Sequence, residues 1–150
     1  MPIKGVEIGQ EFTFSKTVGE VDVTLFAGLT GDFSDTHINE QYMQEKSSIG
    51  RRIAHGALIV GYMSTASTIS IAHVIHRTDL EEFPVSAGYD GIRFIRPVLL
   101  GDTVTVIYRV AEIDEEKRRS TATMEVINQH GEIVAVGRHL MKWAKKLSNG

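Results

Sequence analysis

One stretch of this chain, residues 56–74, contains no aspartate, glutamate, lysine or arginine. Apolar side chains are distributed nearly all round a helix formed by this stretch, so other elements must cover it. The stretch is almost long enough to cross a bilayer, but it carries several hydroxyl side chains and a histidine, and no second such stretch accompanies it. The sequence therefore predicts a buried central helix in a protein that is not inserted in a membrane.

Most of the remaining sequence alternates β-branched or aromatic residues with polar ones, a pattern typical of strands. Strands are expected at five places, which are residues 11–15, 85–94, 103–113, 120–127 and 133–143. Turn-forming runs at 114–117 and 128–131 separate the last three and indicate antiparallel hairpins. An antiparallel sheet curved around the uncharged helix gives an α+β fold, and the edges of such a sheet invite pairing with a second copy of the chain.

The composition places the chain among ordinary globular proteins and excludes several functions. Its 150 residues suit a single domain spanning 1–150, with 42% hydrophobic and 23% charged residues. The net charge of −3 argues against a nucleic-acid partner. Because the chain has no cysteine, it has no disulfide, thiolate nucleophile or cysteine-bound metal. The first five residues do not resemble a secretory signal, so we expect a cytoplasmic protein.

An acid and a base lie five residues apart in the run 31–37, Gly-Asp-Phe-Ser-Asp-Thr-His. The run lies between a helix expected over 21–29 and a short helix that Asn39 could cap. Asp32 and His37 are the pair of groups that a protein needs to polarise a water, or to move a proton on and off a small substrate. The start of the uncharged helix would present unpaired backbone N–H groups to a negatively charged oxygen. Together these features indicate a catalytic site.

Three segments of the sequence resemble the motifs of the MaoC-like, (R)-specific enoyl-CoA hydratases. Residues 26–37, FAGLTGDFSDTH, resemble the hydratase motif of that family, F-A-x-L-[ST]-G-D-x-N-P-x-H. Residues 53–58, IAHGAL, resemble the motif at the start of its central helix, and residues 94–102, FIRPVLLGD, resemble its strand-and-turn motif. The resemblance implies the hot-dog fold, in which a curved antiparallel sheet wraps a long central helix, and assembly as a homodimer.

The resemblance also implies roles for individual residues. Asp32 and His37 take the positions of the catalytic pair, which holds and activates a water. Gly56 takes the position whose backbone N–H polarises the thioester carbonyl of the substrate. Ser64 falls where a serine of the central helix lines the site and supports the pair. The alternative for Ser64 is a purely structural role in helix packing.

Three more residues lie near the pair, and we expect two of them, Ser34 and His55, to line the site. Ser34 and Asp35 replace the Asn-Pro of the family motif, and the missing proline changes the rigidity of the loop. We expect Ser34 to line the site and Asp35 to act as a turn residue, although its carboxylate would raise the pKa of Asp32 if it lay close. His55 is expected to be a helix-cap residue whose ring donates a structural hydrogen bond.

Four arginines are candidates for binding the phosphates of coenzyme A; they are Arg51, Arg52, Arg93 and Arg96. The alternative for each is an ordinary solvated charge. The other histidines show no metal-like spacing with carboxylates. We therefore expect no metal, and no cofactor other than the coenzyme A carried by the substrate.

The resemblance and the residues together predict a lyase. The predicted reaction is hydration of trans-2-enoyl-CoA to (3R)-hydroxyacyl-CoA, or the reverse dehydration, by a water that Asp32 and His37 activate. One alternative is a hot-dog thioesterase, in which Asp32 directs the water at the carbonyl carbon. Another is a non-catalytic acyl-thioester binding protein, which the retention of both Asp32 and His37 disfavours.

Overall fold

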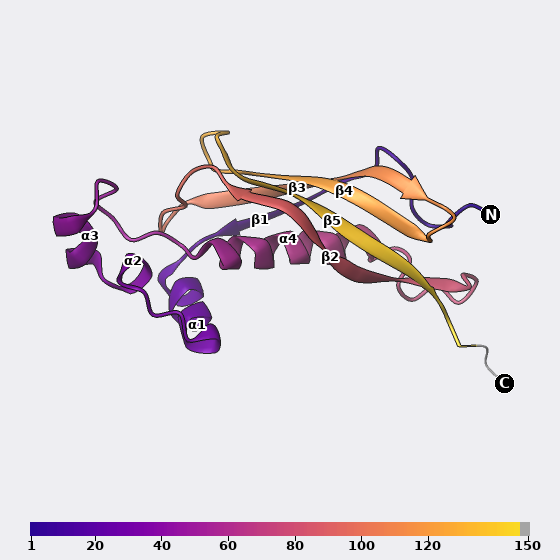
Figure 1. The fold of residues 1–150 in the computed structure, drawn as a ribbon, viewed down its shortest axis with the longest axis horizontal. Helices are drawn as coiled ribbons and strands as arrows, with labels where there is room; N and C mark the ends of the chain where they lie inside the picture. The colour runs from indigo at the N-terminus through magenta and orange to yellow at the C-terminus, as the bar shows by residue number, and fades with distance from the viewer. Residues whose placement is uncertain (148–150) are drawn as a thin grey trace.

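The computed structural model describes residues 1–147, and the strands in this range form one five-stranded sheet in the order β1-β3-β4-β5-β2 (Figure 1). Every neighbouring pair is antiparallel. The strands are β1 (Glu11–Thr17), β2 (Glu82–Phe94), β3 (Thr103–Asp114), β4 (Arg119–Ile127) and β5 (Ile133–Lys145). All five predicted strands are confirmed, some with a few residues more. The predicted domain range of 1–150 stays a prediction, and its last three residues lie outside those described.

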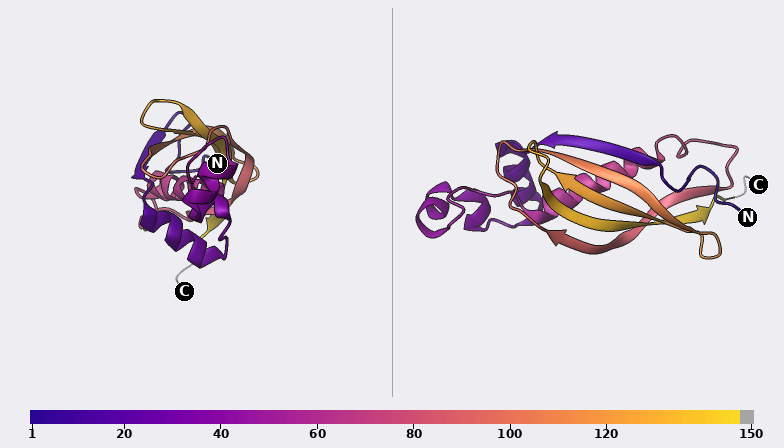
Figure 2. Two further views of the ribbon diagram at one scale, coloured as in Figure 1. Left: turned by 90° about the vertical axis from the view of Figure 1, so that its left-hand side faces the viewer. Right: turned by 90° about the horizontal axis from the view of Figure 1, so that it is seen from above.

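The central helix α4 (Gly56–Ile71) lies along one face of the sheet, which curves over it (Figures 1 and 2). Its buried residues recur at helical spacing, which gives the helix one continuous face toward the sheet; they are Leu58, Ile59, Tyr62, Met63, Ala66, Ser67 and Ser70. Alternate residues of β3, β4 and β5 point at this face and are buried with it. None of the helices within residues 1–147 has both the length and the apolar character needed to span a membrane.

The other face of α4 is exposed, so the expectation that other elements cover the helix all round is wrong for a single chain. This face carries small and hydroxyl residues such as Gly61, Ser64 and Thr68. The hydroxyl of Thr68 donates to the Ser64 carbonyl one turn back, at 3.3 Å. A hydroxyl group that bonds to the backbone of its own helix has its hydrogen bond satisfied there, so this face needs no covering element. The helix also ends at Ile71, three residues before the end of the uncharged stretch.

Three short helices gather at one end of the sheet (Figures 1 and 2). They are α1 (Glu20–Thr30), α2 (Asp35–Ile38) and α3 (Glu40–Lys46). The first and third were predicted, and the Asn39 side chain caps α3 by accepting the Tyr42 N–H at 2.9 Å. The run expected to be a loop contains α2. Only Val23, Ala27 and Met43 are buried in these helices, so hydrogen bonds rather than a core hold most of this layer in place.

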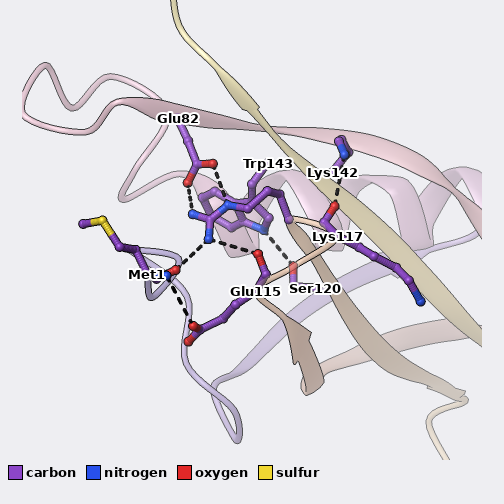
Figure 3. Close-up of polar contacts among 8 residues, drawn as sticks. Met1, Glu82, Glu115, Lys117, Ser120, Lys142 and Trp143 are labelled. Atoms are coloured by element: carbon purple, nitrogen blue, oxygen red, sulfur yellow. Dashed lines mark hydrogen bonds and ion pairs between the residues drawn. The ribbon is translucent and has the colours of Figure 1, made fainter.

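At the opposite end of the molecule, Arg118 ties the β3–β4 hairpin to two other segments (Figure 3). Its backbone has φ of 51°, which is unusual for a residue other than glycine. Its guanidinium pairs with Glu82 at the start of β2 and donates to the Met1 carbonyl at 2.6 Å. The hydrogen bond from Arg118 lowers the pKa of Glu82. These contacts hold the hairpin in its strained turn, far from the region of Asp32 and His37.

Candidate active site

The structure brings Asp32 and His37 together beside the start of α4. Asp32 follows Gly31, which ends α1 in the left-handed conformation, and His37 lies in α2. His37 Nε2 lies 3.9 Å from Asp32 Oδ2. This gap is too wide for a direct hydrogen bond, but one water at about 2.8 Å from each atom would bridge it. The other oxygen of Asp32 accepts the Ser34 N–H at 3.3 Å, which helps to orient the carboxylate.

The hydrogen bonds of His37 settle which of its ring nitrogens carries the proton. Nδ1 lies 2.8 Å from the carbonyl oxygen of Ile53. Because a carbonyl only accepts, Nδ1 must donate, and Nε2 of the neutral ring keeps its lone pair. Two acceptors, this lone pair and the Asp32 carboxylate, therefore face the same gap. A single water can donate one O–H to each and still present its oxygen to a substrate.

His55 contacts both Asp32 and His37. Its Nε2 donates to the backbone carbonyl of Asp32 at 3.0 Å, and its ring stacks on that of His37 with centroids 3.8 Å apart. Phe26 of α1 packs against the His55 ring, with centroids 4.8 Å apart. His55 occupies the N-cap position of α4, but its side chain does not cap the helix. The structural hydrogen bond expected from this ring thus goes to the loop that carries Asp32.

Asp32, His37 and His55 also form a cluster of potential metal ligands. One atom from each side chain lies within 4.8 Å of the others, and a carboxylate with two imidazoles is a donor set that divalent metals use. One nitrogen of each ring is already bonded to a backbone carbonyl. The remaining nitrogen of His55 is fully buried and has no hydrogen-bond partner. Spacing in the sequence did not reveal this cluster, because His55 is distant along the chain and reaches the pair only through the fold.

An apolar cavity of about 320 Å³ opens beside this cluster. The side chains of His37 and Arg96 and the backbone of Gly56 line it, and the rest of its wall is mostly aliphatic or aromatic. The apolar lining includes Ile49, Ile53, Ile59, Phe94, Ile95, Pro97, Val98, Val134 and Ala135. The cavity thus lies between the start of α4, the end of β2 and the start of β5. It offers space for a small apolar group next to His37.

Gly56 lies at the wall of the cavity as the first residue of α4. Its N–H has no acceptor within the helix, because the carbonyl one turn back lies outside the helix. The ring of Phe94 packs directly on this residue, and a Cβ atom at Gly56 would lie 2.5 Å from two ring carbons. Only glycine therefore fits here without displacing Phe94. The sequence motif indicated Gly56, but this contact with Phe94 was not predicted.

Two serines and Asp35 lie outside the cavity wall. Ser64 is exposed on α4, two turns after Gly56, and no hydrogen bond of the described residues joins it to Asp32 or His37. Ser34 is exposed at the N-cap of α2, next to the pair. The carboxylate of Asp35 accepts a hydrogen bond from Asn39 at 3.2 Å, as expected for a turn residue. A role for Ser64 in the site stays a prediction.

The four arginines occupy different surroundings. The side chain of Arg52 is 13% exposed, and each of its three guanidinium nitrogens donates within the protein, two of them to Glu20 and one to the carbonyl of His37. Arg96 lines the cavity and pairs with Glu132 at 3.3 Å. Arg51 and Arg93 are exposed, and each donates to a backbone carbonyl. Contacts of these arginines with coenzyme A stay a prediction.

The sequence matches a profile of the family described as MaoC like domain over residues 4–133. The chain belongs to this family. Among similar proteins, an (R)-specific enoyl-CoA hydratase of Rhodospirillum rubrum is 33% identical over 79% of this chain and 78% of its own length. A 3-hydroxybutyryl-CoA dehydratase of Methylorubrum extorquens is 30% identical over 94% of this chain and 83% of its own length.

Solved structures agree with the family assignment of this MaoC-like domain. The (R)-hydratase from A. caviae involved in PHA biosynthesis superposes with a TM-score of 0.78 at 26% identity, covering 93% of this chain and 98% of its own. The resemblance read from the three sequence motifs is thereby confirmed. The α+β hot-dog fold, with its antiparallel sheet over a long helix, is confirmed as well.

Proposed function

We propose that this MaoC-like domain hydrates trans-2-enoyl-CoA to (3R)-hydroxyacyl-CoA, or catalyses the reverse dehydration. The observation that carries the proposal is the gap of 3.9 Å between His37 Nε2 and Asp32 Oδ2, beside an apolar cavity that also reaches Gly56. The names of the hydratase and dehydratase relatives support the same chemistry. At about 30% identity these relatives support the reaction class more strongly than any particular acyl chain.

The geometry suits the addition of water across a conjugated double bond. A water held by Asp32 and His37 loses one proton to the pair as its oxygen bonds to the β-carbon. The electron pair of the double bond moves onto the thioester oxygen, and the pair then returns a proton to the α-carbon. Acid–base catalysis of this kind contributes roughly 10²–10⁴-fold. The Gly56 N–H at the positive end of the α4 dipole would stabilise the enolate oxygen, by on the order of 3 kcal/mol.

Water is the nucleophile in this reaction, so we propose that no cofactor takes part beyond the coenzyme A of the substrate. Dialysis against a chelator should leave turnover unchanged. Loss of turnover that Zn²⁺ or Mn²⁺ restores would instead assign the cluster of Asp32, His37 and His55 to a metal. The cytoplasmic location stays a prediction.

We further propose a homodimer that forms along β2. Within residues 1–147 this strand is at one edge of the sheet and pairs only with β5, so its outer backbone groups can pair with a strand of another chain. Val85 is 44% exposed, and Phe94 and the adjacent Ile95 are 57% and 51% exposed. Phe94 and Ile95 also line the cavity. A second copy docked here would cover these apolar side chains and shield the mouth of the cavity.

A hydration assay with crotonyl-CoA, which follows loss of absorbance of the conjugated thioester, tests the reaction. Asp32→Asn and His37→Ala should each lower kcat by about 10²-fold or more, while circular dichroism shows both variants folded. Asp35→Asn is a matched control, because the same change is made three residues away in an exposed carboxylate, and it should retain activity. Full turnover by both variants of the pair would contradict the proposal. Release of free thiol without hydration would identify a thioesterase instead.

A further inference from the structure

We infer that the ion pair between Glu20 and Arg52 is a positioning device, which sets the distance between Asp32 and His37 by tying α1, the helix that precedes Asp32 in the chain, to the backbone of His37. The inference rests on the proposed function for its kinetic consequence. Glu20 and Arg52 bond to each other, and Arg52 bonds to the backbone of His37; among the described residues neither makes a hydrogen bond to the Asp32 carboxylate or the His37 ring. They would act through His37 and not on the substrate.

Packing alone does not fix the helices and the loop that carry Asp32 and His37. In α1 only Val23 and Ala27 are buried, and α2, which contains His37, has no buried residue. Figure 1 shows α2 and α3 beyond the end of the sheet and α1 below this end, near the start of α4. Elements with so few buried apolar contacts open locally at little cost. The separation of Asp32 and His37 therefore depends on the polar contacts that join these elements.

Arg52 joins α1 and α2 through its guanidinium group. Two of its guanidinium nitrogens donate to the two carboxylate oxygens of Glu20, the first residue of α1, at 2.8 and 2.9 Å. Its Nε donates to the backbone carbonyl of His37 at 2.7 Å. A planar guanidinium fixes direction as well as distance when it binds in this bidentate way. The α1 helix, whose C-cap residue Gly31 directly precedes Asp32, is thus held by its first residue at a defined position relative to His37.

Ile53, the residue after Arg52, determines which nitrogen of the His37 ring carries the proton. The Ile53 N–H donates to the Thr36 carbonyl at 3.2 Å, and the Ile53 carbonyl accepts from His37 Nδ1 at 2.8 Å. A shift of Arg52 would move Ile53 and weaken the bond that keeps the proton on Nδ1. The ring would then be free to place its proton on Nε2, where it could no longer accept from the water.

These contacts predict a specific effect on catalysis and a small one on overall stability. Glu20 is 65% exposed, and ion pairs with an exposed partner contribute little to the free energy of unfolding. Misplacing a catalytic group by about 1 Å, in contrast, can lower the rate by about 10²-fold. We expect Arg52→Met, which keeps the apolar stem and removes the donors, to lower kcat by about tenfold or more with KM nearly unchanged.

The experiment combines kinetics with a direct measurement on His37. Arg52→Met and Glu20→Gln are compared with Arg138→Met, a matched control whose guanidinium pairs with the exposed Glu112 away from the site. Crotonyl-CoA hydration gives kcat and KM for each protein. Nitrogen-15 NMR of the imidazoles, assigned with the help of His37→Ala, shows which nitrogen of His37 carries the proton. Only Nδ1 should carry it in the unmodified protein and in the control, whereas both nitrogens should share it in Arg52→Met.

The results decide the inference even if one variant or the proposed reaction fails. If Arg52→Met and Glu20→Gln keep both kcat and the single protonated nitrogen, the inference is wrong. If the unmodified protein hydrates no enoyl thioester, the proposed function fails, but the NMR comparison still tests the positioning. If Arg52→Met does not fold, Glu20→Gln carries the test, because its site is mostly exposed. A Glu20→Gln protein with the wild-type kcat and NMR spectrum would then overturn the inference.

Discussion

His37 and His55 have stacked rings but opposite hydrogen-bonding arrangements, and this divides their roles. His37 uses Nδ1 to hold the Ile53 carbonyl, which leaves Nε2 facing Asp32. His55 uses Nε2 to hold the Asp32 carbonyl, and its Nδ1 is buried without a partner. Only His37 therefore presents a lone pair to the gap where a water can bind. His55 keeps the backbone of Asp32 and the ring of His37 in place.

Gly56 offers a sharp test at the scale of one residue. In Gly56→Ala the new methyl group would meet the Phe94 ring at 2.5 Å, so the ring or the start of α4 must move. Overpacking of this kind costs about 1–3 kcal/mol of stability. Displacement of the N–H that we propose faces the thioester oxygen should also lower kcat by about 10²-fold. Crotonyl-CoA kinetics and urea unfolding measure the two effects.

Gly61→Ala is the control for this prediction. It makes the same change in the same helix, where a Cβ atom would meet nothing within 4 Å. Replacing a helical glycine by alanine should stabilise the protein by about 0.5–1 kcal/mol and leave kcat unchanged. Equal kcat values for the two alanine variants would show that Gly56 contributes nothing particular to the site.

The sequence predicts those parts of the site that lie close together along the chain, and misses those that the fold assembles. Asp32 and His37 are five residues apart, and Gly56 opens an uncharged segment, so motif and spacing identify all three. The contact of Phe94 with Gly56 joins β2 to α4, and no local pattern records it. Arg52 was considered for phosphate binding because a sequence shows its charge but not its partner, Glu20.

At the scale of elements, the strands were predicted because one face of the sheet is buried, which imposes an alternating pattern on each strand. Helix α2 was missed because its four residues are too few for a hydrophobic period and none of them is buried. The exposed face of α4 was missed because small and hydroxyl residues carry almost no periodic signal. Sequence patterns thus report burial, and elements without burial escape them.

The buried side chain of His139 joins three strands and predicts how the sheet responds to acid. Its ring nitrogens bond Ser86 of β2 at 2.7 Å and Tyr108 of β3 at 2.8 Å. Burial lowers the pKa of His139 from 6.5 to about 4 and raises that of Tyr108 to about 12, so both groups are neutral near neutral pH. The unfolded chain binds a proton at this histidine below about pH 6.5, and the folded protein does so only near pH 4.

Stability contributed by His139 is therefore complete above about pH 6.5 and is lost as the pH falls toward 4. The free energy of unfolding should fall by about 2 kcal/mol between about pH 7 and pH 5 because of this group. Urea unfolding at several pH values measures the slope, and His139→Gln should remove this part of it. His130→Gln, at an exposed turn, is the control. A slope that His139→Gln leaves unchanged would contradict the assignment.

At the scale of the whole molecule, the sheet has two unequal edges, and only one suits a second copy. β1 is short and alternates exposed with half-buried residues, whereas β2 spans Glu82–Phe94 and carries exposed apolar side chains next to the cavity. Val85→Glu tests which edge pairs. Its carboxylate would lie opposite Lys142 of β5, so the single chain should tolerate it. In a dimer along β2 the charge would be buried in the interface at a cost of several kcal/mol.

We expect size-exclusion chromatography with light scattering to show a dimer for the unmodified protein and a monomer for Val85→Glu. In the proposed dimer the second copy shields the mouth of the cavity, so crotonyl-CoA hydration should fall together with the dimer population as the protein is diluted. Thr13→Glu places the same charge at an exposed position of β1 and should leave the protein dimeric and active. A Val85→Glu dimer beside a Thr13→Glu monomer would move the interface to the other edge. This follows because a charge blocks strand pairing only at the edge where pairing takes place. The apolar side chains of β2 would then need a different partner.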